Sequence, residues 1–254
     1  MPHKISLGKW VDALPANALL YRFCKRYVDH YHGENNPDMH TNGELAWLRQ
    51  VLPHCKVVFD VGANVGNWTA LALSLNPALH VHCFEPSAAT FRHLQARAFE
   101  KGQVSLNPLG LSASPGEMTL HLFGEAAGTN SLYRREGLPI EQTQTEQIHL
   151  DTLDAYCQRE NVTHIDLLKM DVEGHELRVL QEAAQMLSQG KIQRIQFEYG
   201  GSYIDARILL KDMFELLTSY GYRLHKLYPR QLRPVDHYEQ RLENFQYQNW
   251  VAIK

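Results

Sequence analysis

The 254-residue sequence contains few cysteines and no Cys-x-x-Cys pair. Its four cysteines are Cys24, Cys55, Cys83 and Cys157, and they are widely separated. This spacing indicates neither a disulfide framework nor a zinc site. It is typical of a reducing compartment, so we expect a cytoplasmic protein.

Long apolar runs and long basic runs are also missing. No stretch approaches the roughly 18 to 20 apolar residues of a membrane span, and the N-terminus lacks the apolar core of a signal peptide. We therefore expect no stable membrane insertion. The net charge is −3, whereas nucleic-acid binding depends on clustered Lys and Arg, so nucleic acid is not an expected partner. With 44% hydrophobic residues, the chain can bury the core of one large domain.

The Gly-x-Gly-x-x-Gly fingerprint of dinucleotide-binding folds is absent as well. Instead, an apolar strand ends in Asp60 and is followed by a Gly-x-x-x-Gly turn, Gly62 to Gly66, which leads directly into a helix. Such a turn lets backbone approach a nucleotide-like ligand, but its spacing is wrong for a pyrophosphate at the helix N-terminus. The next apolar strand ends in Glu85, which is suited to accept both hydroxyls of a ribose. S-adenosylmethionine is the commonest adenosine ligand without a diphosphate.

Strand-like and helix-like segments alternate along most of the chain. This order predicts an α/β fold with a mostly parallel, seven-stranded sheet covered by helices on both faces. The predicted strands are 56–61, 79–84, 103–107, 164–170, 192–199, 222–228 and 248–253. Residues 118–123 predict a hairpin added near the third strand, and the polar segment 124–147 predicts a loop facing the substrate.

Three helices can be predicted from their periodicity or position. Apolar residues recur every three to four positions over 16–31, which predicts an amphipathic helix packed on the domain. Two other roles remain open for this helix: a lid over the ligand, or a dimer contact that would make the protein a homo-oligomer. Residues 44–51 predict a second helix, and 204–220 predict a third that ends at Gly221. Ser87 is expected to cap the helix after the second strand.

Taken together, the motifs resemble the FkbM family of S-adenosylmethionine-dependent methyltransferases. The matching segments are the turn after Asp60, Phe84-Glu85-Pro86, residues 168–176, Phe197-Glu198-Tyr199-Gly200, Asn42-Gly43-Glu44, Thr152-Leu153-Asp154 and the closing Asn249-Trp250-Val251-Ala252. The resemblance extends from about residue 42 to the C-terminus. It implies an N-terminal helical extension, residues 1–41, and a methyltransferase domain, residues 42–254.

This resemblance also implies details of fold and activity. The expected fold is that of a Rossmann-like class I methyltransferase, in which the last strand is inserted antiparallel. The expected reaction is O-methylation of a hydroxyl on a small molecule or glycan, such as a sugar, a glycan precursor or a secondary metabolite. Methylation of nitrogen or carboxylate, and a binding module without turnover, are the alternatives. A dehydrogenase fits poorly because of the glycine spacing.

Candidate cofactor contacts gather where the parallel strands end, since ligands bind at the carboxyl ends of such sheets. The backbone of the turn would approach the methionine part, Asp60 would hold its ammonium directly or through water, and Glu85 would hold the ribose. Ser112 is expected beside the adenine. The complete predicted set is Glu44, Asp60, Gly62, Ala63, Asn64, Gly66, Asn67, Glu85, Ser112 and Asp171. Within this set, Glu44 could equally be a helix cap and Asn67 simply the first polar residue of a helix.

The segment from Asp171 to His175 should carry the chemistry. Transfer to an alcohol needs a base, and imidazole titrates near neutrality, so His175 is the first candidate, followed by Asp171 and Glu198. An alternative is that Asp171, Glu173, His175 and Glu198 hold a divalent cation such as Mg²⁺, because that ion prefers oxygen ligands.

Overall fold

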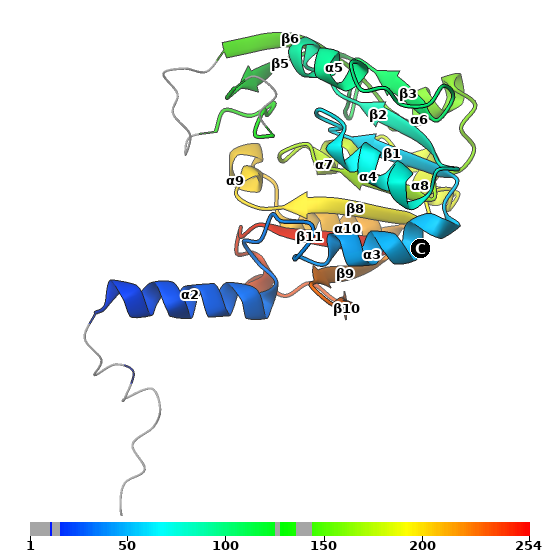
Figure 1. Cartoon of the computed structure of the whole chain (residues 1–254). Helices are drawn as coiled ribbons and strands as arrows, with labels where there is room; N and C mark the ends of the chain where they lie inside the picture. Colours follow the sequence, from blue (N-terminus) through cyan, green and yellow to red (C-terminus); the bar gives the residue numbers. More distant parts are fainter. Residues whose placement is uncertain (1–10, 12–15, 125–127, 136–143) are drawn as a thin grey trace, which may run out of the picture.

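The computed structural model describes residues 11, 16–124, 128–135 and 144–254. Its centre is an eight-stranded sheet in the order β10-β9-β11-β8-β7-β1-β2-β3 (Figure 1). The strands are β1 (Val57–Val61), β2 (His80–Phe84), β3 (Val104–Asn107), β7 (Leu167–Met170), β8 (Arg194–Tyr199), β9 (Arg223–Tyr228), β10 (Gln231–Val235) and β11 (Gln248–Ile253). All seven predicted strands are present. The predicted strand number was wrong because β10 adds an eighth strand, in a hairpin with β9.

Strand direction follows the class I methyltransferase pattern. From β3 through β2, β1 and β7 to β8 all neighbours are parallel. The last strand, β11, lies antiparallel between β8 and β9. This insertion confirms what the family resemblance implied. Because β1, β2, β7 and β8 all run in the same direction, their carboxyl ends lie along one edge of the sheet.

Helices cover both faces of the sheet. One face packs on α3 (Glu44–Val51), α4 (Asn67–Leu75) and α5 (Ala88–Gln95), and the other on α6 (Leu153–Arg159), α7 (Glu176–Gln181), α8 (Ala184–Ser188) and α10 (Leu210–Ser219). Alternate strand residues belong to the two cores: Val58 lies in the same core as Leu48 and Ala72, whereas Phe59 lies in the core that contains Leu153 and Met213. This is the two-residue period of a strand buried on both faces. The described residues also form two short 3-10 helices, Leu52–His54 and Gln240–Leu242.

A smaller sheet is formed by strands that follow β3 in the chain, and it has the order β4-β6-β5. Its strands are β4 (Gly110–Leu111), β5 (Gly116–Leu122) and β6 (Gln144–Asp151). The predicted strand over 118–123 is present as β5, but the predicted hairpin was wrong, because the antiparallel partner of β5 is β6, which follows the long loop. The predicted loop was too long, since residues 144–147 belong to β6. Residues 125–127 and 136–143 of that loop lie outside the described part of the chain.

Two helix predictions need correction. Residues 204–220 form two helices, α9 (Ser202–Ala206) and α10, because Arg207 adopts φ 56° and ends the first. Ser87 stands at the N-cap of α5 but makes no capping bond. The amide of Ala88 instead donates to Glu146 over 2.8 Å.

The N-terminal helix α2 (Ala18–His32) was predicted within two residues, but the expected packing was wrong. None of its residues is buried, and it projects from the body along one edge of the molecule (Figure 1). No helix in the described part of the chain is both long and apolar enough to cross a bilayer.

Candidate functional site

The turn after β1 adopts its shape because of two glycines. Gly62 has φ 77°, and a Cβ there would lie 2.0 Å from the carbonyl oxygen of Asp171. Gly66 has φ 78°, and its Cβ would lie 2.6 Å from Cδ1 of Leu94. A side chain is therefore excluded at both positions by backbone conformation and by space. The first glycine brings the turn directly against the end of β7.

Glu85, at the end of β2, ties this turn to the neighbouring strand. Its Oε2 accepts from the amide of Asn64 over 3.0 Å, and its Oε1 accepts from the amide of Ser87 over 3.0 Å. Burial raises the pKa of its carboxyl to about 7. Each oxygen of a carboxylate has two lone pairs, so Glu85 keeps the capacity to accept from two further hydroxyls.

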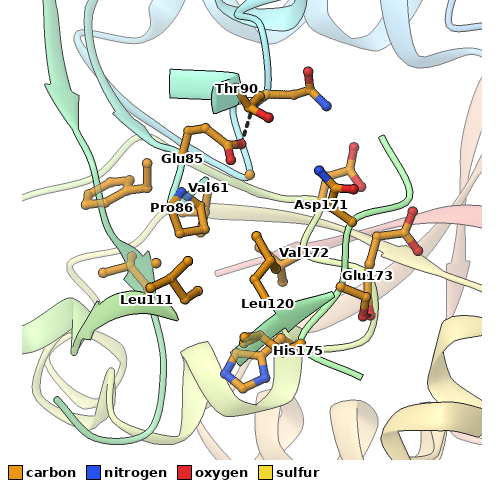
Figure 2. A pocket seen from close by; sticks show the side chains of 18 of the residues that line it. Val61, Glu85, Pro86, Thr90, Leu111, Leu120, Asp171, Val172, Glu173 and His175 are labelled. Atoms are coloured by element: carbon orange, nitrogen blue, oxygen red, sulfur yellow. Dashed lines mark hydrogen bonds between the residues drawn. The ribbon is translucent and has the colours of Figure 1, made fainter. Parts of the chain in front are cut away.

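Glu85 and Asp171 border opposite sides of a cleft of about 730 Å³, a volume that includes its open mouth (Figure 2). Its polar edge consists of the turn, Glu85 and the segment after β7. Its apolar wall comes mainly from the smaller sheet: Leu111, Leu120, Ile148 and Leu150. Ligand clefts typically combine apolar walls with a few convergent polar groups. The lining of this cleft therefore suits a ligand that has both an apolar ring and hydroxyl groups, such as a nucleoside.

Asp60 does not reach the cleft. It is fully buried, and its carboxylate accepts from Thr69 Oγ1 over 2.7 Å and from Lys169 Nζ over 2.9 Å. Lys169 also donates to the carbonyl of Gly62 over 3.2 Å. Burial alone would lower the pKa of Lys169, but Asp60 and Asp171 outweigh it and hold the pKa above its usual value. The predicted direct contact with a ligand ammonium is thus replaced by support of the turn from behind.

Three further predicted contacts also lie behind the cleft wall. Glu44 is buried and accepts from Gln196 Nε2 over 2.6 Å and from Trp68 Nε1 over 3.2 Å. The side chain of Asn67, in the first turn of α4, accepts from Arg97. These partners favour structural roles for Glu44 and Asn67. Gly62 and Asn64 do line the cleft, as predicted, whereas Ala63 and Gly66 shape the turn beside it.

Ser112, the third of these predicted contacts, hydrogen-bonds to His175 and does not line the cleft. Its Oγ lies 2.9 Å from His175 Nε2, while Tyr133 OH lies 2.9 Å from Nδ1 of the same ring. Burial lowers the pKa of His175 to about 4. A neutral imidazole offers one donor and one acceptor, and here both nitrogens already have partners. His175 therefore borders the cleft without a free nitrogen, which weakens its case as a general base.

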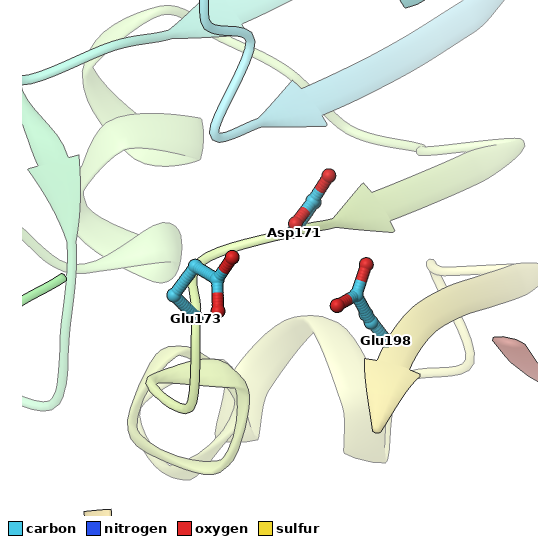
Figure 3. Close-up of side chains that lie close together, drawn as sticks. All are labelled: Asp171, Glu173 and Glu198. Atoms are coloured by element: carbon cyan, nitrogen blue, oxygen red, sulfur yellow. The ribbon is translucent and has the colours of Figure 1, made fainter. Parts of the chain in front are cut away.

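Asp171, Glu173 and Glu198 point toward a common space, with one oxygen from each within 4.8 Å of the others (Figure 3). Glu173 accepts from Arg135 Nη1 over 2.6 Å, and burial, followed by the charge of Asp171, raises its pKa to about 7. Burial and the surrounding acids raise the pKa of Glu198 well above its usual range. Three of the four predicted metal ligands are thus together, and His175 lies outside the group. Carboxylate oxygens so placed suit a hard divalent cation.

A second cleft adjoins the first at these acids. It is lined by Pro37, Gly128, Arg135, Asp171, Glu173, Glu198, Gly200, Gly201, Ser202 and Tyr247. Asp171, Glu173 and Gly128 line both clefts. A ligand in the first cleft and a second molecule in the other would therefore meet at the end of β7.

Sequence reasoning missed Lys169, Arg135 and Tyr133. The signal for Lys169 was present, because a lysine in the middle of an apolar strand must be paired when it is buried. Arg135 and Tyr133 gave no signal, since they lie in the polar segment after β5 and reach the acids and His175 only through the fold.

The fold and the turn define a Rossmann-like methyltransferase. The model of the methyltransferase FkbM domain matches residues 60–224, and the chain belongs to this family. The solved structure of methyltransferase FkbM from Methylobacillus flagellatus KT aligns with a TM-score of 0.50 at 16% identity, covering 78% of this chain and 43% of that one.

Two curated relatives match part of the chain. The 31-O-demethyl-FK506 methyltransferase FkbM of Streptomyces tacrolimicus is 31% identical over 153 residues, covering 49% of this chain and 58% of the relative. The hexuronic acid methyltransferase AglP of Haloferax volcanii is 26% identical over 176 residues, covering 67% and 69%. The matched part thus spans little more than half the length of the first relative.

Proposed function

We propose that this protein transfers the methyl group of S-adenosylmethionine to a hydroxyl of a sugar, glycan precursor or secondary metabolite. The observation that carries the proposal is the meeting of two clefts at Asp171 and Glu173. Methyl transfer needs the acceptor oxygen aligned behind the methyl carbon, and such alignment supplies much of the rate enhancement. Residues 42–254 would form the catalytic domain and residues 1–41 an extension.

In this proposal the first cleft holds the cofactor. Glu85 accepts the ribose hydroxyls, the backbone at Gly62 and Asn64 contacts the methionine part, and the apolar wall of the smaller sheet packs against the adenine. Asp171 lies where the positively charged sulfonium would sit, and its side chain is 41% exposed. Asp60 and Lys169 act indirectly by fixing the turn.

Among the three candidate bases, we place Glu198 first. None of the described side chains or amides donates a hydrogen bond to its carboxylate, whereas both nitrogens of His175 are occupied. Burial and the neighbouring acids raise the pKa of Glu198, which makes its ionised form a stronger acceptor for a hydroxyl proton. The relatives' names support oxygen acceptors and uronic acids, since one refers to 31-O-demethyl-FK506 and another to hexuronic acid.

A divalent cation at Asp171, Glu173 and Glu198 is the second candidate mechanism. It is favoured by the convergence of the three carboxylates, and it would lower the pKa of a bound hydroxyl. Proton removal by Glu198 and activation by a cation lead to opposite expectations for the effect of a chelator.

Calorimetry with S-adenosylmethionine, S-adenosylhomocysteine and a nicotinamide dinucleotide tests the cofactor. We expect binding of the first two and none of the third; the reverse would overturn the proposal. Formation of S-adenosylhomocysteine with a panel of uronic acids, neutral sugars and macrocyclic alcohols then tests turnover. Mass spectrometry of the product distinguishes an ether from an ester or a methylated amine. Binding without turnover of any acceptor would favour a cofactor-binding module.

A further inference from the structure

The helix α2 turns its apolar side away from the rest of the protein. Six side chains, which we call the apolar stripe, recur every three to four positions and are all exposed: Leu19, Leu20, Phe23, Tyr27, Val28 and Tyr31. Leu19 is 80% exposed and Phe23 is 72% exposed. A helix on a globular protein normally buries such a stripe in the core. The orientation here is the reverse.

The polar side of the same helix faces its own chain. Arg22, Lys25, Arg26 and Asp29 line a cleft between α2 and residues 33–42. None of the stripe residues lines this cleft. The stripe is therefore not covered by the described residues, and covering it would require the helix to rotate.

Rotation is opposed by the way α2 is attached. Gly33 ends the helix with φ 67°, and the amide of Asn35 donates to the carbonyl of Tyr247 over 2.8 Å. Glu34 is buried and accepts from Lys226 Nζ over 2.8 Å and from Asn244 Nδ2 over 2.9 Å. At the other end the side chain of Asn17 caps two amides. The stripe is thus held in a fixed outward direction.

The charge of α2 indicates what kind of partner covers the apolar stripe. The helix contains three of the chain's 25 Lys and Arg residues but only one of its 28 Asp and Glu residues. It is therefore positive in a chain whose net charge is −3. In two copies paired through the stripe these cations would gain no partner, because they lie on the opposite side of the helix. An anionic lipid surface complements both features, because interfacial helices combine aromatic and aliphatic residues on one side with Lys and Arg on the other.

We propose that α2 lies in the surface of an anionic lipid bilayer, with the apolar stripe among the lipid headgroups and upper chains. The helix has 15 residues, fewer than the roughly 20 needed to span a membrane, so it lies along the surface. Arg22 and Arg26 can extend toward lipid phosphates while their stems contact apolar groups.

This docking would also position the second cleft. Pro37, in the segment that follows α2, lines that cleft together with Tyr247, whose carbonyl binds Asn35. If the proposed methyltransferase function holds, the acceptor would be reached close to the lipid surface, as suits a saccharide carried on a lipid. The docking itself does not depend on that function.

Flotation with lipid vesicles tests the proposal on the whole chain of residues 1–254. Vesicles of phosphatidylcholine alone are compared with vesicles containing about 30% phosphatidylglycerol. We expect binding to the anionic vesicles, at least tenfold weaker binding to the neutral ones, and release by high salt, since exposed charge interactions are screened. Failure of the wild-type protein to bind anionic vesicles would overturn the proposal.

Matched variants locate the contact. Phe23→Glu combined with Tyr27→Glu should reduce binding at least tenfold, whereas Met118→Glu, an exposed apolar position on β5, should not. Arg22→Glu combined with Arg26→Glu should also reduce binding to the vesicles. Arg92→Glu combined with Lys101→Glu, near the β3 edge of the sheet, is the matched control and should not reduce it. Unchanged cofactor affinity confirms folding, and sedimentation gives the oligomeric state. Equal lipid binding by the stripe variant, or a wild-type dimer that this variant converts to monomer without any lipid binding, would refute docking on lipid.

Discussion

Lys169 Nζ lies 2.9 Å from Asp60 Oδ1, and both side chains are buried directly beneath the glycine turn. The same ammonium donates to the carbonyl of Gly62. Asp60, near the end of β1, thus supports the proposed cofactor cleft through a lysine from β7. The pair connects the two strands whose ends carry the proposed cofactor and methyl-transfer groups.

We expect Lys169→Met to destabilise the protein by about 3 to 5 kcal/mol, because it leaves the Asp60 carboxylate buried without its partner. Lys211→Met, at an exposed pair with Glu215, is the control and should cost less than about 1 kcal/mol. Urea unfolding measures both. Equal midpoints for the two variants would mean that water or other groups satisfy Asp60.

Gly62→Ala should be more damaging than Gly102→Ala, although both glycines have positive φ. The strain of a left-handed alanine, about 1 to 2 kcal/mol, is common to both. Only at Gly62 would the new Cβ meet a backbone carbonyl at 2.0 Å, while nothing lies within 4 Å at Gly102. Thermal unfolding and calorimetry with S-adenosylhomocysteine should show lost stability and affinity for Gly62→Ala alone. Comparable behaviour of the two variants would show that the turn can move away from β7.

How much could be predicted differs between the fold and the site. The strands were predictable because apolar runs bounded by glycines and acids recur along the chain, and the family resemblance supplied the antiparallel β11. The strand β10 could not be predicted, because its apolar alternation is weak and because it contains Pro234. An edge strand tolerates proline. The outward stripe of α2 escaped prediction because periodicity reports that a helix has an apolar side, not which way it faces.

At the site, sequence position identified the acids but not their partners. Glu85, Asp171 and Glu198 were all assigned to strand ends, and each lines a cleft. Asp60 was also assigned to a strand end, but its side chain is buried beneath the cleft. Its carboxylate is bound there by Lys169 and Thr69, which reach it from other elements. Likewise, the pairing of His175 with Ser112 and Tyr133 depends on segments far apart in the sequence.

Glu85 should make cofactor binding dependent on pH. Burial raises its pKa to about 7 in the protein without ligand, and an ionised carboxylate is the better acceptor for ribose hydroxyls. The dissociation constant for S-adenosylhomocysteine should therefore fall as pH rises from 6 to 8. Glu85→Gln should remove this dependence, and Glu85→Ala should weaken binding by about 1.5 to 3 kcal/mol. Glu117→Gln, at an exposed carboxyl, is the control. A pH dependence retained by Glu85→Gln would assign the titration to another group.

His175 should instead affect stability in acid. Its folded pKa of about 4 lies below the unfolded value near 6.5, so the unfolded chain binds more protons between these values. The stabilisation from a neutral His175 is complete above pH 6.5 and is lost as pH falls toward 4. At pH 5 the loss from this group should be about 2 kcal/mol. We expect the stability difference between pH 7 and pH 5 to shrink by that amount in His175→Asn, as measured by urea unfolding. An unchanged difference would mean that His175 is protonated in the folded protein.

The base and the cation can be separated with Glu198→Gln, assayed with an acceptor that the wild-type protein methylates. If Glu198 removes the hydroxyl proton, kcat should fall by about 10² to 10⁴, cofactor affinity should stay within twofold, and chelator should leave the wild-type rate unchanged. His175→Asn should then lower kcat much less, because its ring positions groups at the edge of the cleft. Glu215→Gln, on the exposed side of α10, controls for the substitution.

If Asp171, Glu173 and Glu198 instead hold a divalent cation, exhaustive chelation should abolish turnover of the wild-type protein, and Mg²⁺ or Mn²⁺ should restore it. Asp171→Asn should then raise the concentration of metal needed for half-maximal rate, which proton removal by Glu198 alone would not produce. A loss of 10² or more in His175→Asn, together with normal activity in Glu198→Gln, would return the role of base to the histidine. Full activity in all three variants would leave alignment of the two clefts at β7 as the source of catalysis.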